Sequence, residues 1–323
     1  MAETIRAGRV LRDYKLRARL YHRLIRLDRG RARGDLRDMI EPLNETRAIL
    51  GEGPVWHDGE LIWVDIEGRR VHVGERTFDV GERVGCAWPC SRGHQLICGL
   101  QSGIAFLDLE SGQLQPVVDP EGSLPRARFN DGKCDPLGRF WAGTMDMEEA
   151  EPLGSLYMLD PGGQLTRQLG EITVANGLAW GPDGRSFYYI DSPTREVAAF
   201  AYDPETGSLS DRRVAIRIPE GEGFPDGMTI DAEGKLWIAL WGGWGVVRYD
   251  PESGERLGKI DLPVEKVTSC VFGGKHLDEL YITTASIGLD AAARDQQPLA
   301  GMVFHTRPGV SGLPAVPYAG TSP

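Results

Sequence analysis

The stretch "DGMTIDAEGKLWIAL", residues 226–240, contains the unit that repeats along the chain: a polar segment, a turn with glycine and a short apolar strand. Such a unit occurs six times after about residue 50, at intervals of 35, 44, 47, 49 and 44 residues. The first apolar residues of the six strands are Leu61, Leu96, Phe140, Phe187, Leu236 and Leu280. A period of this length with several strands per unit predicts a β-propeller, and six units predict six blades.

Residues 41–323 are therefore expected to form an all-β domain, a six-bladed β-propeller. We expect its final strand, near Met302–His305, to close the ring beside the first blade. A sandwich of two antiparallel sheets would account for the strands but not for their regular period. A parallel α/β sheet is disfavoured because no sustained helical pattern occurs after residue 40.

The first forty residues differ from the rest of the chain, with twelve Lys and Arg against five Asp and Glu. Apolar residues recur at roughly helical spacing over residues 7–38, which predicts a basic N-terminal helical segment. Three interpretations stay open: a helix that binds a membrane surface or a partner, a solvated extension, or sequence upstream of a natural start at Met39.

Composition narrows the class of protein further. The net charge of −11 argues against a nucleic-acid partner. Five cysteines without C-x-x-C spacing are expected to be free thiols in a reducing compartment, which favours a cytoplasmic protein. The longest uncharged apolar stretch, Leu236–Val247, is too short to span a membrane. A monomer or a small homo-oligomer is equally compatible with these features.

Polar residues occur about ten positions before the strand markers, at the same phase of four blades. These residues are Glu52, Asn130, Asn176 and Asp226, while Cys86 and Cys270 take the same phase in the other two units. Equivalent positions in a closed ring point to one end of the channel, so the four side chains should converge. Two carboxylates and two amide oxygens form an oxygen-donor site suited to Ca²⁺, Mn²⁺ or Mg²⁺, and with less preference to Zn²⁺.

Each of these polar residues is followed, at once or within two positions, by a glycine: Gly53, Gly132, Gly177 or Gly227. Glycine permits a sharp turn and the close approach of a ligand, although Asn-Gly and Asp-Gly are also ordinary turn dipeptides. Motifs of serine hydrolases, zincins, P-loops and dinucleotide sites are missing. Two tryptophans near the channel, Trp241 and Trp244, are interpreted as packing residues rather than as a platform for a sugar.

Four longer segments resemble the regucalcin-like gluconolactonase family, and the later "QQPLAG" (296–301) and "PGVSGLP" (308–314) resemble its bacterial sugar-lactonase branch. The four longer segments are "GEGPVW" (51–56), "RFNDGKCDPLGRFWAGTM" (128–145), "NGLAWGPDGRSFYYIDS" (176–192) and "GFPDGMTIDAEGKLWIALWGG" (223–243). The resemblance implies a propeller that holds one divalent cation (Ca²⁺, Zn²⁺, Mn²⁺ or Fe²⁺), with Glu52, Asn176 and Asp226 as metal ligands. It implies that Arg128, Asn130 and Glu148 bind the substrate, and Asp131 is a lesser candidate beside them.

The expected function is therefore the metal-dependent hydrolysis of a small sugar lactone to its aldonic acid. In this interpretation Asp226 is the catalytic base and also touches the metal. Two other functions stay open. One is a propeller hydrolase acting on phosphotriesters or aryl esters, and the other is a calcium-binding regulatory protein without turnover.

Overall fold

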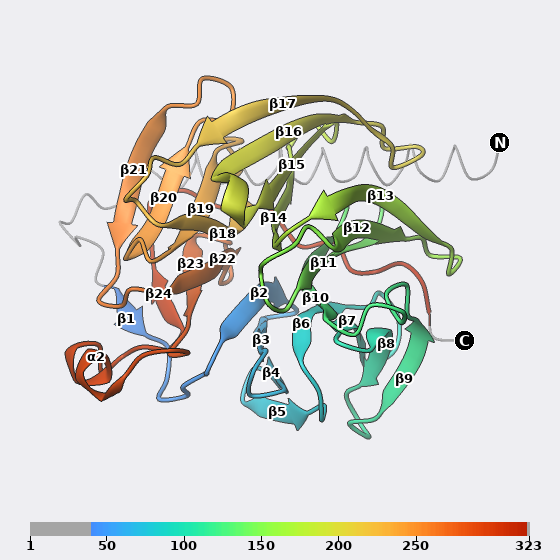
Figure 1. Ribbon diagram of the computed structural model, residues 1–323, viewed down its shortest axis with the longest axis horizontal. Helices are drawn as coiled ribbons and strands as arrows, with labels where there is room; N and C mark the ends of the chain where they lie inside the picture. Colours follow the sequence, from blue (N-terminus) through green and yellow to red (C-terminus); the bar gives the residue numbers. More distant parts are fainter. Residues whose placement is uncertain (1–39, 322–323) are drawn as a thin grey trace.

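The computed structural model describes residues 40–321, which form six four-stranded antiparallel sheets arranged around a common centre (Figure 1). The expected six-bladed β-propeller is confirmed. In the first five blades the strands follow one another in chain order, and the first strand of each lies nearest the centre in Figure 1. The helix expected over residues 7–38 lies outside the described residues.

The first blade consists of β2 (Gly51–His57), β3 (Glu60–Asp65), β4 (Arg70–Val73) and β5 (Arg76–Asp79). The second consists of β6 (Val84–Pro89), β7 (Gln95–Leu100), β8 (Gly103–Asp108) and β9 (Leu114–Val118). The third consists of β10 (Ala127–Cys134), β11 (Phe140–Asp146), β12 (Gly154–Leu159) and β13 (Leu165–Ile172). The fourth consists of β14 (Ala175–Trp180), β15 (Ser186–Asp191), β16 (Glu196–Tyr202) and β17 (Leu209–Arg217), with the short helix η1 (Ser192–Thr194) between β15 and β16. The fifth consists of β18 (Phe224–Ile230), β19 (Leu236–Trp241), β20 (Gly245–Tyr249) and β21 (Arg256–Asp261).

The sixth blade joins the two ends of the described chain. Its strands, from the centre outward, are β22 (Val267–Gly273), β23 (Glu279–Thr284), β24 (Phe304–Thr306) and β1 (Glu41–Pro42), and α2 (Ala291–Gln296) lies between β23 and β24. The strand expected near Met302–His305 is present as β24, but it is the third strand of this blade. The closing pairing is made by β1, in which Pro42 lies opposite Phe304.

The first three strands of the blades carry most of the apolar residues that fill the core, and the second strands carry large aromatic ones. Trp141 and Phe187 are fully buried and lie with their ring centroids 5.3 Å apart, which joins the third and fourth blades. A buried aspartate, Asp135, accepts the indole N–H of Trp141 at 3.0 Å. Asp231 accepts the indole N–H of Trp237 in the same way, at 2.9 Å. In these two blades the carboxylate that accepts backbone N–H groups of the turn before the second strand also holds the following tryptophan.

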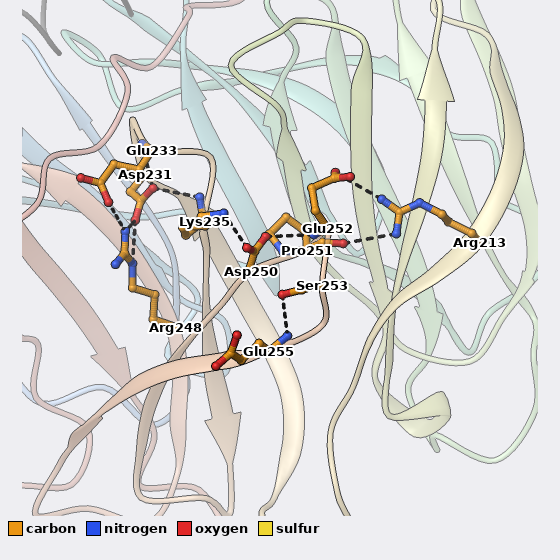
Figure 2. Close-up of polar contacts among 10 residues, drawn as sticks. All are labelled: Arg213, Asp231, Glu233, Lys235, Arg248, Asp250, Pro251, Glu252, Ser253 and Glu255. Carbon is orange, nitrogen blue, oxygen red and sulfur yellow. Dashed lines mark hydrogen bonds and ion pairs between the residues drawn. The ribbon is translucent and has the colours of Figure 1, made fainter.

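Figure 2 shows polar contacts within the fifth blade and between the fifth and fourth blades. Arg248 donates to both Asp231 and Glu233, and Lys235 lies 2.8 Å from Asp250. Arg213 of β17 reaches across to Glu252, at 3.3 Å. The pair of Arg213 and Glu252 between the two blades is exposed and contributes little, whereas the Asp231 carboxylate that Arg248 contacts is buried.

The C-terminal strap, residues 307–321, crosses the far end of the central channel and contacts several blades. Gly312 N–H donates to Leu277 O, and Tyr318 N–H donates to Pro89 O, each at 2.8 Å. Its apolar residues Leu313–Val316 line a small cavity together with channel residues that include Lys133. The strap therefore covers one end of the channel and leaves the other end to the polar residues described below.

All five cysteines are free and buried, as expected. Among residues 40–321, no helix has the length and apolar character needed to cross a bilayer.

Candidate active site

The innermost strand of every blade has an irregularity in its register with the second strand, at the same level of the propeller. The six irregularities lie between Glu52 and Val55, Val84 and Cys86, Phe129 and Asp131, Asn176 and Leu178, Pro225 and Met228, and Val267 and Ser269. Such bulges re-aim side chains out of the regular alternation of a strand. The four predicted polar residues occur at or inside these bulges, which turns them toward a common pocket.

The glycines after the polar residues serve mainly close packing rather than turning. Only Gly53 has a positive φ, of 52°. A Cβ at Gly177 would lie 2.9 Å from the carbonyl oxygen of Asp226 in the next blade, and a Cβ at Gly132 would lie 2.8 Å from Cys86 Sγ. Glycine is therefore required where the innermost strands of neighbouring blades touch, which brings their polar residues together.

These residues line one pocket of about 340 Å³ at the open end of the channel. Glu52, Asn130, Asn176 and Asp226 all line it, so the predicted convergence of the four blades is present in the structure. Arg128 lines the same pocket. Cys86 and Cys270, which hold the same phase in the other two blades, are buried apolar residues and are not among the pocket's lining residues.

A chain of hydrogen bonds fixes the amide side chains. Arg128 Nη1 donates to Asn130 Oδ1 at 2.6 Å, and Asn130 Nδ2 donates to Asn176 Oδ1 at 3.1 Å. Asn176 Nδ2 donates to Ser192 Oγ at 2.9 Å, and the serine hydroxyl donates to Pro225 O at 2.6 Å. Both amide oxygens are thereby identified and oriented, and each retains a second lone pair for a ligand. Ser192, in η1, is a site residue that had no signal in the blade repeat.

The two carboxyl groups are neighbours and both are buried. Burial, followed by the negative charge of Asp131, raises the pKa of Glu52 to about 8. Burial, followed by the charge of Glu52, raises the pKa of Asp226 well above its usual range. Two neighbouring carboxyl groups without a cation hold a proton, because both cannot ionise at low cost. A divalent cation that replaces this proton would bind with a large favourable free energy, because it neutralises both carboxylates.

The donor set fits a hard divalent cation. Glu52 and Asp226 supply carboxylate oxygens and Asn176 supplies an amide oxygen, which are ligands that Ca²⁺, Mn²⁺ and Mg²⁺ prefer. Within residues 40–321, no three His, Cys, Asp or Glu side chains form a metal-ligating group. Only two of the proposed metal ligands are charged, and the other ligand atoms are amide oxygens.

Asp131 and Arg128 are the other buried charges at the site. Asp131 Oδ1 accepts Gly132 N–H at 2.7 Å, whereas Oδ2 has no hydrogen-bond partner among the described residues. Burial lowers the pKa of Arg128 to about 10, so its guanidinium stays charged at neutral pH. The guanidinium also donates to Phe129 O at 3.0 Å, which holds it at the pocket wall.

The structure does not bring Glu148 to the lining of this pocket. Its exposed carboxylate pairs with Arg126, at 2.7 Å, on the outer side of the turn after β11. The next residue, Glu149, lines the pocket and has a φ of 52°, in the left-handed region. Sequence reasoning missed Glu149 because two adjacent glutamates in a turn give no indication of which one faces inward.

Comparisons with known proteins identify the family to which the chain is similar. The sequence profile described as "SMP-30/Gluconolactonase/LRE-like region" matches residues 50–286. Regucalcin from Danio rerio is 43% identical over 292 residues, covering 87% of this chain and 98% of that protein. A Bacillus subtilis protein named as a sugar lactone lactonase, YvrE, is 38% identical over 287 residues, covering 85% and 97%. The crystal structure of a calcium-binding protein, regucalcin, from Agrobacterium tumefaciens has a TM-score of 0.82 and 28% identity, covering 86% of this chain and 96% of that one.

Proposed function

Because the chain belongs to the SMP-30/gluconolactonase/LRE-like family, we propose that it hydrolyses a small sugar lactone with the help of one divalent cation. The observation that carries the proposal is the pair of buried carboxyl groups, Glu52 and Asp226, beside the oriented amide of Asn176. The name of the Bacillus subtilis relative supports lactone hydrolysis, and the name of the Agrobacterium tumefaciens protein supports calcium among the candidate cations. Zinc, manganese and iron(II) stay alternatives for the same oxygen ligands.

A bound cation would polarise the lactone carbonyl and lower the pKa of a nearby water. Asp226 takes a proton from the attacking water, and the ring C–O bond opens as the tetrahedral oxyanion collapses. The guanidinium of Arg128 stabilises that oxyanion and orients the lactone. Asn130 fixes Arg128 by accepting its N–H, and its amide group faces the same pocket. The proton held by Asp226 then returns to the alkoxide that leaves from the opened ring.

Hydroxyl groups of the substrate find polar partners around this centre. Asn130, Ser192 and Glu149 line the pocket in addition to the proposed metal ligands. The family resemblance implies that Glu148 binds the substrate, but Glu149 is the glutamate that lines the pocket. The buried free thiols support a reducing compartment, which is the basis for proposing a cytoplasmic enzyme.

The test is hydrolysis of a panel of aldonolactones by metal-stripped protein, with Ca²⁺, Mn²⁺, Zn²⁺ or Fe²⁺ added back singly. Acid release is followed with a pH indicator. Turnover that depends on added metal is expected for one or more lactones. Turnover of phosphotriesters or aryl esters alone would instead support the other hydrolase, and metal binding without any turnover would support a calcium-binding regulatory protein.

A further inference from the structure

One side of the pocket is formed by an aromatic wall, Phe224 and Trp241, for which the proposed chemistry has no use. The two residues lie directly opposite each other on β18 and β19. Phe224 is two positions before Asp226 in the sequence. Both line the pocket, and Phe224 is 41% exposed. Trp241 thus has a place in the pocket wall rather than only in the packing of the fifth blade.

The aromatic wall is held in position by two cations. Arg195 Cζ lies 4.0 Å from the centroid of the Phe224 ring, and Arg195 Nη1 donates to Gly223 O at 2.6 Å. Lys266 Nζ lies 4.9 Å from the centroid of the Trp241 ring and donates to Ile287 O at 2.6 Å. Cation–π contacts of this kind fix aromatic rings. A wall that is already ordered binds an apolar group without the cost of ordering its own side chains.

The remaining lining divides into a polar group and an apolar group. The polar side chains belong to the hydrogen-bonded set around Asn130 and to the two carboxyl groups, with Glu149 as an addition. The apolar residues are Leu50, Ile66, Met145, Val174 and Pro193, besides the aromatic wall. A hydroxyl group placed against these residues would lose its hydrogen bonds to water without replacement, whereas an alkyl group would be removed from water favourably.

We propose that the pocket accepts lactones that carry an alkyl substituent, with the acyl group at the polar side chains and the substituent against the aromatic wall. This inference rests on the proposed lactone hydrolysis, and it extends the substrate range beyond fully hydroxylated sugar lactones. Phe224 and Trp241 are then specificity-determining residues, since they contact the part of the substrate that does not react.

The experiment compares δ-valerolactone with δ-octalactone, its propyl-substituted homologue, using the metal-loaded full chain. Each additional buried carbon contributes a factor of about four, so kcat/KM for δ-octalactone should be higher by about tenfold or more. In Phe224→Ala and in Trp241→Ala this advantage should fall by about tenfold through KM, while kcat/KM for δ-valerolactone changes less than about twofold.

Leu257→Ala is the matched control for Phe224→Ala. Leu257 is 43% exposed, lies on β21 of the same blade and is not among the lining residues of this pocket, so its truncation should leave both lactones unaffected. The inference is overturned if the wild-type protein does not prefer δ-octalactone. It is also overturned if Phe224→Ala lowers kcat/KM equally for both lactones, because the residue would then act on folding or on the reacting centre.

A binding measurement separates this inference from the proposed function. The corresponding lactams, 2-piperidone and 6-propyl-2-piperidone, resist hydrolysis, and their affinities are measured by calorimetry on the metal-loaded protein. Tighter binding of the propyl lactam that is lost in Phe224→Ala is expected, whether or not any lactone is turned over. Equal affinities would overturn the inference, whereas an absence of metal-dependent turnover of every lactone would overturn the proposed function.

Discussion

Replacing Glu52 by Gln should change the stability of the metal-free protein in a way that depends on pH. Burial and the neighbouring charge of Asp131 raise the pKa of Glu52 from 4.5 to about 8. A carboxyl group whose pKa is raised by folding contributes stability that is fully present below about pH 4.5 and is lost as the pH rises through about 8. The free energy of unfolding of the metal-stripped wild type should therefore fall between pH 5.5 and pH 8.5.

The magnitude follows from the displacement of the pKa. Each pKa unit corresponds to roughly 1.4 kcal/mol, so the fall amounts to several kcal/mol if Glu52 alone is counted. The glutamine variant cannot ionise at this position and still offers an oxygen to the N–H of Gly53, which donates to Glu52 Oε2 at 3.0 Å in the wild type. The variant should accordingly lose less stability over the same pH range, by the part that Glu52 contributes, while buried Asp226 still contributes its own pH dependence.

The assay is urea unfolding in EDTA at both pH values, followed by calorimetric titration with Ca²⁺ and Mn²⁺. The wild type should regain its stability when the metal is added, because the cation replaces the proton. In Glu52→Gln, which lacks one of two charged ligands, metal affinity should be lower by about 100-fold or more. Glu75→Gln, an exposed position in the same blade, is the control. The same pH dependence in wild type and Glu52→Gln, or unaltered metal affinity in the variant, would refute the electrostatic argument.

Three further predictions concern the same site. Asp226→Ala should abolish metal-dependent lactone turnover measured with a pH indicator, and wild-type activity in that variant would contradict the assignment of the base. Arg128→Ala should raise KM by about tenfold or more, because it removes charge-assisted contacts that position the substrate, and should also lower kcat, because the oxyanion loses its guanidinium; an unchanged KM in initial-rate measurements would show that Arg128 does not bind the lactone. Gly177→Ala should destabilise the fold by about 1–3 kcal/mol in urea unfolding because its Cβ would meet Asp226 O and Ile190. Gly258→Ala, whose Cβ would meet nothing within 4 Å, is the matched control, and equal stability of the two variants would contradict the packing argument.

The repeat predicted the blades because turn and strand signals are local. Equivalent phase then predicted that Glu52, Asn130, Asn176 and Asp226 share one pocket, since a closed ring places equivalent positions at one end. The ring closure was harder to predict, because β1 has only two residues and no periodicity of its own. Its partner β24 is visible as an apolar segment, but nothing in the sequence indicates which strand completes its sheet.

The choice between two adjacent residues was not predictable from the sequence. Glu148 and Glu149 have the same chemistry, and the structure places Glu149, whose φ is positive, at the lining of the pocket. The bulges in the innermost strands depend on contacts between blades, which a single-strand pattern does not reveal. A tryptophan near a propeller channel is more often a packing residue than part of a binding site, so the sequence predicts packing for Trp241, whereas the structure places it in the pocket wall.

The C-terminal strap has a kinetic consequence for an enzyme built on this propeller. With Leu313–Val316 across the far end of the channel, substrate and product share one passage, past the aromatic wall and Glu149. The acid product must leave before the next lactone enters, and it contacts the same polar side chains while it is bound. Accumulated acid should therefore compete with the lactone for the free enzyme, so that the reaction slows as the product accumulates.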